Sequence, residues 1–405
     1  MPDGLVRTEM RHMPPPLVHG VARLAALAFQ GWSLDELLAV AGPEPASPRS
    51  RAAWLLDRSV ACALGFRPDE AAALQAEALA ITRVFRVRGE CAGLRLLALM
   101  APGNLMVNAP LGFLTAATDV QLDLAYAEPD GALPSSAPDH DVAIVAVSES
   151  APDVLRALPQ RLANWPRPVL NDPRRIANLS RDWLARALDG APGVTVAPTV
   201  AVARGALRRQ PIGALLPGGA FPVLLRPLRS HAGEGLAKLD TPDDLALFLL
   251  ATPGEAFYLT QFIDCRGLQG WFCKHRIAFV DREPFLCHMA ASEHWMVHYL
   301  NAGMAESAAK RAAEAAAMAG FDSGFAVRHR AALAAVCDVV GLDYFSIDAG
   351  EAPDGSLLVF EADVAAIIHS MDDPALYPYK RAPMQRCYDA FAAMLRRRAG
   401  QRAVA

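Results

Sequence analysis

The chain has 405 residues, of which 53% are hydrophobic, and a formal net charge of −4. This length and apolar content predict two or three domains, and the weak negative charge argues against a general role in binding nucleic acid or membrane surfaces. The sequence has 7 cysteines but no CxxC pair, no apolar run of membrane-spanning length and no secretory signal pattern, so we expect a cytoplasmic protein without a disulfide framework.

The first part of the sequence is helical in pattern. Between residues 17 and 88 the apolar residues recur at helical spacing, and glycine and proline occur only between the runs. We expect an all-helical region over residues 1–92. The helix pairs resemble tetratricopeptide units, although no fixed period fits them. Binding a carrier or peptide and bracing a homodimer are both open roles for these helices.

A change of pattern follows at Leu94. Short β-like runs alternate with helix-like runs as far as Asn171, which predicts a parallel sheet with crossover helices over residues 93–175. Ligands of such sheets bind beyond the carboxyl ends of the strands. The sequence places residues 102–104, 148–150 and 171–173 at these ends, and Asn108 and Glu149 are candidates for contact with a substrate.

Later residues predict a mixed α+β region with two features that suit phosphate. The strand FPVLLRPL leads into a glycine-bearing loop at residues 229–235, whose backbone N–H groups could hold phosphates, although an ordinary turn is the alternative. In the hairpin that follows AFYLTQFID, Lys274 and Arg276 lie two residues apart on one face of a strand. Two cations placed in this way are suited to share an anion such as phosphate.

A second hairpin, between Gly341 and Asp363, carries acidic residues. Two apolar strands flank a Pro-Asp-Gly turn, and alternation places Glu361 and Asp363 on one face with Asp348 opposite them. Converging carboxylates repel one another unless a cation joins them, and oxygen ligands suit Mg²⁺. A solvated acidic hairpin is the alternative.

The order of these parts resembles the ATP-grasp superfamily, and especially its RimK-like and glutathione-synthetase-like carboxylate–amine ligases. The motifs that carry the resemblance are NDPRRI with the helix that begins at Arg181, FPVLLRPLRSHAGEGL, YLTQFID, KHRIAFVDREPFL, HWMVHYLNAGM, and GLDYFSIDAG through FEADVA. The resemblance implies an ATP-grasp fold of the α/β and α+β classes. After the helical region 1–92 it implies a pre-ATP-grasp domain over 93–175, a small flap subdomain over 176–260, and a large subdomain with the metal site over 261–405.

The resemblance also implies roles for individual residues. Arg181 and Arg226 stand where the family has lysines that bind the phosphates of ATP, and Arg226 and Arg276 are the implied catalytic residues. The implied magnesium ligands are Asp348, Glu361 and Asp363, of which Asp363 replaces the usual asparagine. The implied nucleotide-binding residues are Arg181, Arg226, Ser230, His231, Gly233, Gly235, Gln261, Phe262, Ile263 and Lys274.

The activity implied by the resemblance is an ATP-dependent ligation that joins a small-molecule or peptide carboxylate to an amine, with ATP and Mg²⁺ and without nucleic acid or membrane. A phosphotransferase and a non-catalytic nucleotide-binding scaffold are the alternatives. The expected substrate-binding residues are Trp295, His298, Tyr299 and His369.

A transition-metal site is a further alternative for the same part of the chain. His294 and His298 have the i, i+4 spacing of zinc ligands on a helix, with His288 upstream. Their aromatic and apolar neighbours favour a packed or substrate-lining segment instead. Because the sequence has no GxSxG motif and no cysteine in a recognisable nucleophile context, we expect no covalent catalysis.

Overall fold

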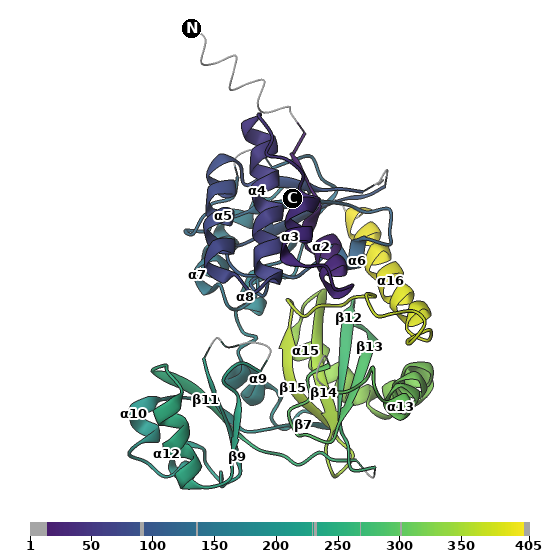
Figure 1. The fold of residues 1–405 in the computed structure, drawn as a ribbon. Helices are drawn as coiled ribbons and strands as arrows, with labels where there is room; N and C mark the ends of the chain where they lie inside the picture. Colours follow the sequence, from purple (N-terminus) through teal and green to yellow (C-terminus); the bar gives the residue numbers. More distant parts are fainter. Residues whose placement is uncertain are drawn as a thin grey trace. The chain divides into compact units, whose positions relative to one another are not determined.

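The computed structural model describes residues 14–89, 93–134, 137–228, 230, 233–267, 269–299 and 302–400 (Figure 1). These form two compact units. The first unit takes its described residues from 1–177, 364–371 and 384–405, and the second comprises those from 178–363 and 372–383. Within the described residues, no helix is long and apolar enough to cross a membrane.

The first unit contains a six-stranded sheet with the order β1-β2-β4-β3-β5-β6. Neighbouring strands are parallel except for β2 and β4, which run antiparallel. The central strands consist almost entirely of buried apolar residues, as expected for a sheet covered on both faces. The strands are β1 (Leu17–Val18), β2 (Val84–Val87), β3 (Arg95–Met100), β4 (Gln121–Tyr126), β5 (Val142–Val145) and β6 (Val169–Leu170).

The N-terminal helices pack on this sheet. Leu55 and Leu56 of α4 and Leu79 of α5 share one apolar core with Phe85 of β2 and Tyr126 of β4. The described residues of the region 1–92 therefore contribute to the first unit, and they form the strands β1 and β2 as well as helices. The helices of this unit are α2 (Gly20–Phe29), α3 (Leu34–Val40), α4 (Pro48–Leu64), α5 (Pro68–Ile81), α6 (Gly112–Thr115), α7 (Pro152–Leu162), α8 (Pro173–Ile176) and the greater part of α16 (Arg381–Gly400).

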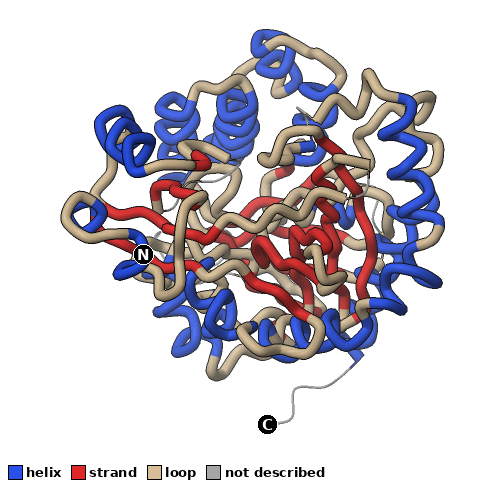
Figure 2. The backbone as a smooth tube through the Cα atoms, turned by 90° about the horizontal axis from the view of Figure 1, so that it is seen from below, coloured by secondary structure: helices blue, strands red, loops and turns tan. Residues whose placement is uncertain are grey.

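Figure 2 shows the strands of the chain in red and its helices in blue. The second unit contains two sheets. The smaller sheet is antiparallel, in the order β10-β9-β11-β8. Its strands are β8 (Thr199–Ala203), β9 (Val223–Pro227), β10 (Ala237–Leu239) and β11 (Ala256–Gln261), and the helices of this part are α9 (Arg181–Leu188), α10 (Arg204–Leu207), α11 (Ile212–Leu215) and α12 (Pro242–Ala251).

The larger sheet has the order β13-β12-β14-β15-β7, and only its edge strand β7 is parallel to its neighbour. Helix α13 packs against β13. The expected sequence of a parallel sheet followed by mixed α+β parts is therefore confirmed. The elements are β7 (Val194–Val196), β12 (Phe272–Val280), β13 (Glu283–Ser292), β14 (Tyr344–Glu351), β15 (Leu357–Asp363), α13 (Ala308–Ala319), the π-helix η2 (Phe321–Phe325), α14 (Ala326–Arg328) and α15 (Arg330–Val340).

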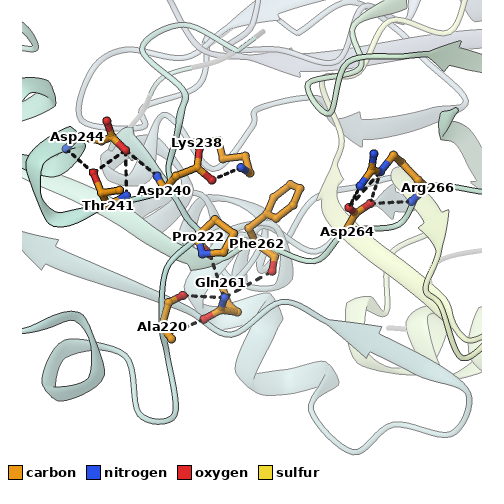
Figure 3. Close-up of polar contacts among 10 residues, drawn as sticks. All are labelled: Ala220, Pro222, Lys238, Asp240, Thr241, Asp244, Gln261, Phe262, Asp264 and Arg266. Carbon is orange, nitrogen blue, oxygen red and sulfur yellow. Dashed lines mark hydrogen bonds and ion pairs between the residues drawn. The ribbon is translucent and has the colours of Figure 1, made fainter. Parts of the chain in front are cut away.

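Helix α12 begins with a capping box, shown in Figure 3. The hydroxyl of Thr241 accepts the N–H of Asp244 at 3.2 Å, and the carboxylate of Asp244 accepts the N–H of Thr241 at 2.9 Å. We predict that Thr241→Ala lowers the free energy of unfolding by about 1 kcal/mol, because an N–H of the first turn loses its acceptor. Urea titration measures the change. Thr252→Ala, at the opposite end of α12, is the control, and an equal loss in both variants would contradict the capping role.

Candidate functional site

A row of polar side chains crosses one face of the larger sheet. His288 of β13 is paired with Arg276 of β12, Arg276 with Asp348 of β14, and Asp348 with Glu361 of β15. Directly opposed residues on neighbouring strands point to the same side of a sheet, so these side chains share a face. The neighbouring His275 points to the other face, where its ring lies 4.7 Å from that of Phe325 in η2.

Asp348 binds two cations. It is 3% exposed, and its carboxylate accepts hydrogen bonds from Arg276 at 2.8 and 2.9 Å and an ion pair from Lys274 at 2.9 Å. Burial alone would raise the pKa of Asp348, but the charges of Arg276 and Lys274 hold it well below the usual range. Lys274 and Arg276 thus share an anion as their spacing predicts, and in this structure that anion is Asp348.

Two further arginines come from other elements. Arg181, the first residue of α9, forms an ion pair with Glu361. Arg226 on β9 is buried, and it donates hydrogen bonds to the hydroxyl of Ser230 at 3.1 Å and to the Ser230 carbonyl. Burial, followed by the charge of Arg181, lowers the pKa of Arg226 to about 10, while Glu361 acts in the opposite direction. Arg226 therefore lies within electrostatic reach of the Arg181–Glu361 pair and stays protonated at neutral pH.

The three predicted metal ligands gather around Arg276. Burial would lower the pKa of Arg276, but the charges of Asp348, Glu361 and Asp363 raise it above its usual value. Within the described residues, however, no group of three or more His, Cys, Asp or Glu side chains is placed to hold a metal ion. The carboxylate oxygens are of the type that Mg²⁺ prefers. Asp348 is held by two cations and Glu361 by Arg181, so the described arrangement is an ion-pair network.

Within the described residues, His288, His294 and His298 belong to no group of three or more side chains that could hold a zinc ion. The ring nitrogen Nδ1 of His294 accepts the N–H of Met296 at 3.2 Å. His298 lies in the electrostatic field of the row, and burial, then Lys274 and Arg276, lower its pKa. His298 therefore lies near the row, and the three histidines form no metal site in the described part of the chain.

The predicted flap follows β9. Gly233 and Gly235 have φ values of +80° and +63°, which favour glycine. A Cβ on Gly235 would lie 2.8 Å from the ring of Pro227, so only glycine lets the loop pass this close to the end of β9. A Cβ on Gly233 would lie 3.4 Å from the sulfur of Met296. Residue 231, the predicted nucleotide-binding histidine, lies outside the described residues.

Gln261, Phe262 and Ile263 are three of the nucleotide-binding residues that the resemblance implies, and Gln261 ends β11. Its side chain accepts the N–H of Ala220 and donates to the carbonyls of Ala220 and Pro222, all at 3.0 Å (Figure 3). Gln261 therefore braces the residues before β9 with its side chain. The ring of Phe262 lies 5.1 Å from the ammonium of Lys238 and 6.2 Å from the ring of Trp295. Ile263, the residue after Phe262, is half-buried.

A buried network adjoins the row and was not predicted from the sequence. Glu314 of α13 is fully buried and accepts the hydroxyls of Tyr299 at 3.2 Å and Tyr379 at 2.7 Å. Lys380 binds Glu314 at 3.1 Å and Asp372 at 2.8 Å. The network reaches the row because the rings of Tyr299 and His288 lie 4.6 Å apart.

The predicted substrate residues divide between the two units. Trp295, His298 and Tyr299 belong to the second unit with the row. His369 belongs to the first unit, where its ring lies 5.9 Å from Phe29 and 6.3 Å from Phe113. Asn108 and Glu149 also belong to the first unit, and the Asn108 side chain exchanges two 2.8 Å hydrogen bonds with the backbone of Ala101.

No protein-family model and no curated protein matches the sequence. Among solved structures, the chain is similar to a RimK domain ATP-grasp protein from Sphaerobacter thermophilus, with 18% identity, a TM-score of 0.42, and coverage of 74% of this chain and 99% of the other. It is similar to the VanG D-Ala:D-Ser ligase from Enterococcus faecalis, with 12% identity, a TM-score of 0.47, and coverage of 75% and 99%. It is also similar to a D-alanine–D-alanine ligase from Bacillus anthracis complexed with ATP, with 14% identity, a TM-score of 0.44, and coverage of 76% and 97%. These are likenesses of fold at low identity.

Proposed function

We propose that the chain is an ATP-grasp enzyme that uses ATP to join a carboxylate to an amine. The observation that carries the proposal is a group of four cations around the carboxylates of Asp348 and Glu361 on the larger sheet. They are Arg181, Arg226, Lys274 and Arg276. Cations contributed by separate elements can hold a polyphosphate on several sides, and this is the main requirement for phosphoryl transfer.

The first chemical step needs charge compensation. The γ-phosphoryl group passes from ATP to an oxygen of the substrate carboxylate, which forms an acyl phosphate and releases ADP. Arg226 and Arg276 offset the charge that spreads over the transferring group, and Asp348 holds the guanidinium of Arg276 through two hydrogen bonds. Glu361 and Asp363 would hold Mg²⁺, which supplies further neutralisation of phosphate charge when bound.

The second step forms the amide. The amine attacks the carbonyl carbon, the bond from that carbon to the phosphate oxygen breaks, and the amine nitrogen loses a proton as phosphate leaves. The Ser230–Gly235 flap would exclude water, which otherwise hydrolyses the acyl phosphate. The contact of Arg226 with Ser230 links the phosphate-binding cation to this flap.

Small-molecule or peptide carboxylates and amines would be the substrates, and the protein would act in the cytoplasm as a homodimer. The cysteines of the described residues are free, which suits a reducing compartment. Residues 93–175, 176–260 and 261–405 would serve as the pre-ATP-grasp, flap and metal-bearing parts.

Calorimetry with ATP and Mg²⁺ tests the nucleotide site. We expect binding by the natural chain, about tenfold or greater weakening in Arg226→Met, and most of the affinity kept in Arg226→Lys, because the lysine restores the charge. Arg208→Met, at an exposed position after α10, is the matched control and should bind as the natural chain does. Absence of binding by the natural chain would contradict the proposal.

Product analysis separates ligase from phosphotransferase. A ligase releases ADP and phosphate and requires both a carboxylate and an amine, whereas a phosphotransferase yields a stable phosphorylated product without an amine. A screen of paired carboxylates and amines, read by ADP release and mass spectrometry, distinguishes the two. A phosphorylated product that forms without any amine would overturn the ligase assignment.

A further inference from the structure

The first unit contains a cavity that the proposed reaction does not use. It has a volume of about 90 Å³ and lies between helices α2, α4 and α5 and the sheet face formed by β2, β3 and β4. This volume is several times what one buried water needs. Small side chains on facing elements, such as Ala22 of α2 and Ala98 of β3, leave the space open. Most of the remaining wall is aliphatic.

The principal charged group in the wall is the carboxylate of Asp57. Asp57 is 4% exposed, and it accepts the backbone N–H groups of His19 at 2.9 Å and Gly20 at 3.1 Å, where helix α2 begins. Within the described part of the chain, no cationic side chain forms an ion pair with it. Burial raises the pKa of Asp57, and these two N–H groups, then the charges of His19 and Arg88, offset part of that rise. A cation in the cavity would complete the compensation.

Another polar group in the wall is the hydroxyl of Tyr126, and the wall also includes Gln75, Asn104 and Asn108. Tyr126 is 6% exposed and lines the cavity, and its hydroxyl has no hydrogen-bond partner within the described residues. Burial, and then the charge of Asp57, raise the pKa of Tyr126, so the two side chains lie within electrostatic reach. A buried tyrosine hydroxyl usually has a partner, since leaving it unsatisfied costs free energy.

We propose that this cavity binds a small primary amine with a short branched alkyl body, with the ammonium group held by Asp57 and the Tyr126 hydroxyl. An ammonium has only donors, which matches a carboxylate and a hydroxyl oxygen as acceptors. Its charge meets a buried carboxylate that forms no ion pair within the described residues and that feels the charges of His19 and Arg88 only at longer range. The alkyl body would cover the aliphatic wall, which includes Leu56, Val60 and Leu124. Apart from Asn108, a candidate for substrate contact that also lines the cavity, the site shares no residue with the proposed ATP reaction and does not depend on that reaction.

A series of probes of equal shape tests the proposal on the full chain. Isobutylamine, isobutanol and isobutyrate share one carbon skeleton and differ in the charge of the head group. We expect calorimetry to show binding of isobutylamine, at least tenfold weaker binding of isobutanol, and none of isobutyrate. Crystals soaked in isobutylamine should show its nitrogen between Asp57 and Tyr126. Equal binding of the amine and the alcohol, or solvent alone in the cavity, would overturn the proposal.

Variants locate the binding within the cavity. Asp57→Asn and Tyr126→Phe should each weaken isobutylamine binding, by at least tenfold for Asp57→Asn, whereas Ala98→Val should abolish it by filling the space. Ala143→Val is the matched control, because Ala143 is equally buried on β5 of the same sheet and does not line the cavity. Retained binding in both Asp57→Asn and Ala98→Val would refute the site. Tyr126→Phe keeps the core ring, so it tests the site even if the aspartate variant fails to fold.

Discussion

Glu361→Gln is expected to reduce ATP turnover by about 100-fold or more. The substitution keeps the size of the side chain but removes the charge that pairs with Arg181 and that would share Mg²⁺ with Asp363. ADP release in the presence of a carboxylate and an amine accepted by the natural chain measures the effect. Calorimetry with ATP shows whether binding or the chemical step is lost.

Glu351→Gln is the matched control for that experiment. Glu351 lies on β14 of the same sheet. It binds Arg328 at 3.0 Å and His329 at 2.8 Å, and neither partner belongs to the row. Its variant should keep full turnover. Turnover that survives in Glu361→Gln would show that the proposed metal site is wrong, whereas an equal loss in both variants would point to damage to the sheet.

Asp348→Asn is expected to lower the free energy of unfolding by about 3–5 kcal/mol, because Arg276 and Lys274 would keep their charges in a buried site without a compensating anion. Urea titration at pH 7 measures the loss. Asp338→Asn breaks an exposed pair with Arg282 and should cost about 1 kcal/mol or less. Similar losses in the two variants would contradict the buried ion-pair network.

The same aspartate makes stability depend on pH. Its pKa in the folded protein lies below the unfolded value of about 3.9, so its contribution is fully present above that value. As the pH falls below about 4, the unfolded state takes up a proton first, and the contribution is lost progressively toward the folded pKa. The gap between the natural chain and Asp348→Asn should therefore narrow between pH 4 and pH 3. A constant gap over that interval would show that Asp348 is not the titrating group.

Local sequence patterns were sufficient to predict the strands and hairpins of the site. Alternation within the strands places Lys274 with Arg276 and Glu361 with Asp363, and the turn at residues 353–355 brings Asp348 opposite Glu361. These relations depend on residues close in sequence or on the fixed geometry of a strand pair. This is why the placement of Asp348 opposite Glu361 could be predicted before the fold was known.

Contacts between distant segments could not be predicted in this way. Arg181 and Glu361 are 180 residues apart, and no periodic pattern relates a helix N-terminus to a particular strand. Glu314 and Lys310 lie in the alanine-rich helix α13, and both are buried, because Tyr379, Lys380 and other partners come from remote parts of the chain. The burial of a charged side chain can be predicted only when its partner in the fold is known.

The path of the chain between the units affects how the protein is made. The first unit includes residues 364–371 and most of α16, where Tyr388 binds Ser370 at 2.8 Å and Phe391 is fully buried. During synthesis these residues leave the ribosome after nearly all of the second unit. The first unit is thus completed only after most of the second unit has been translated. The surface that residues 364–371 and α16 cover in the folded first unit stays uncovered during that time. A gene fragment ending near residue 177 would encode that unit without its closing helix.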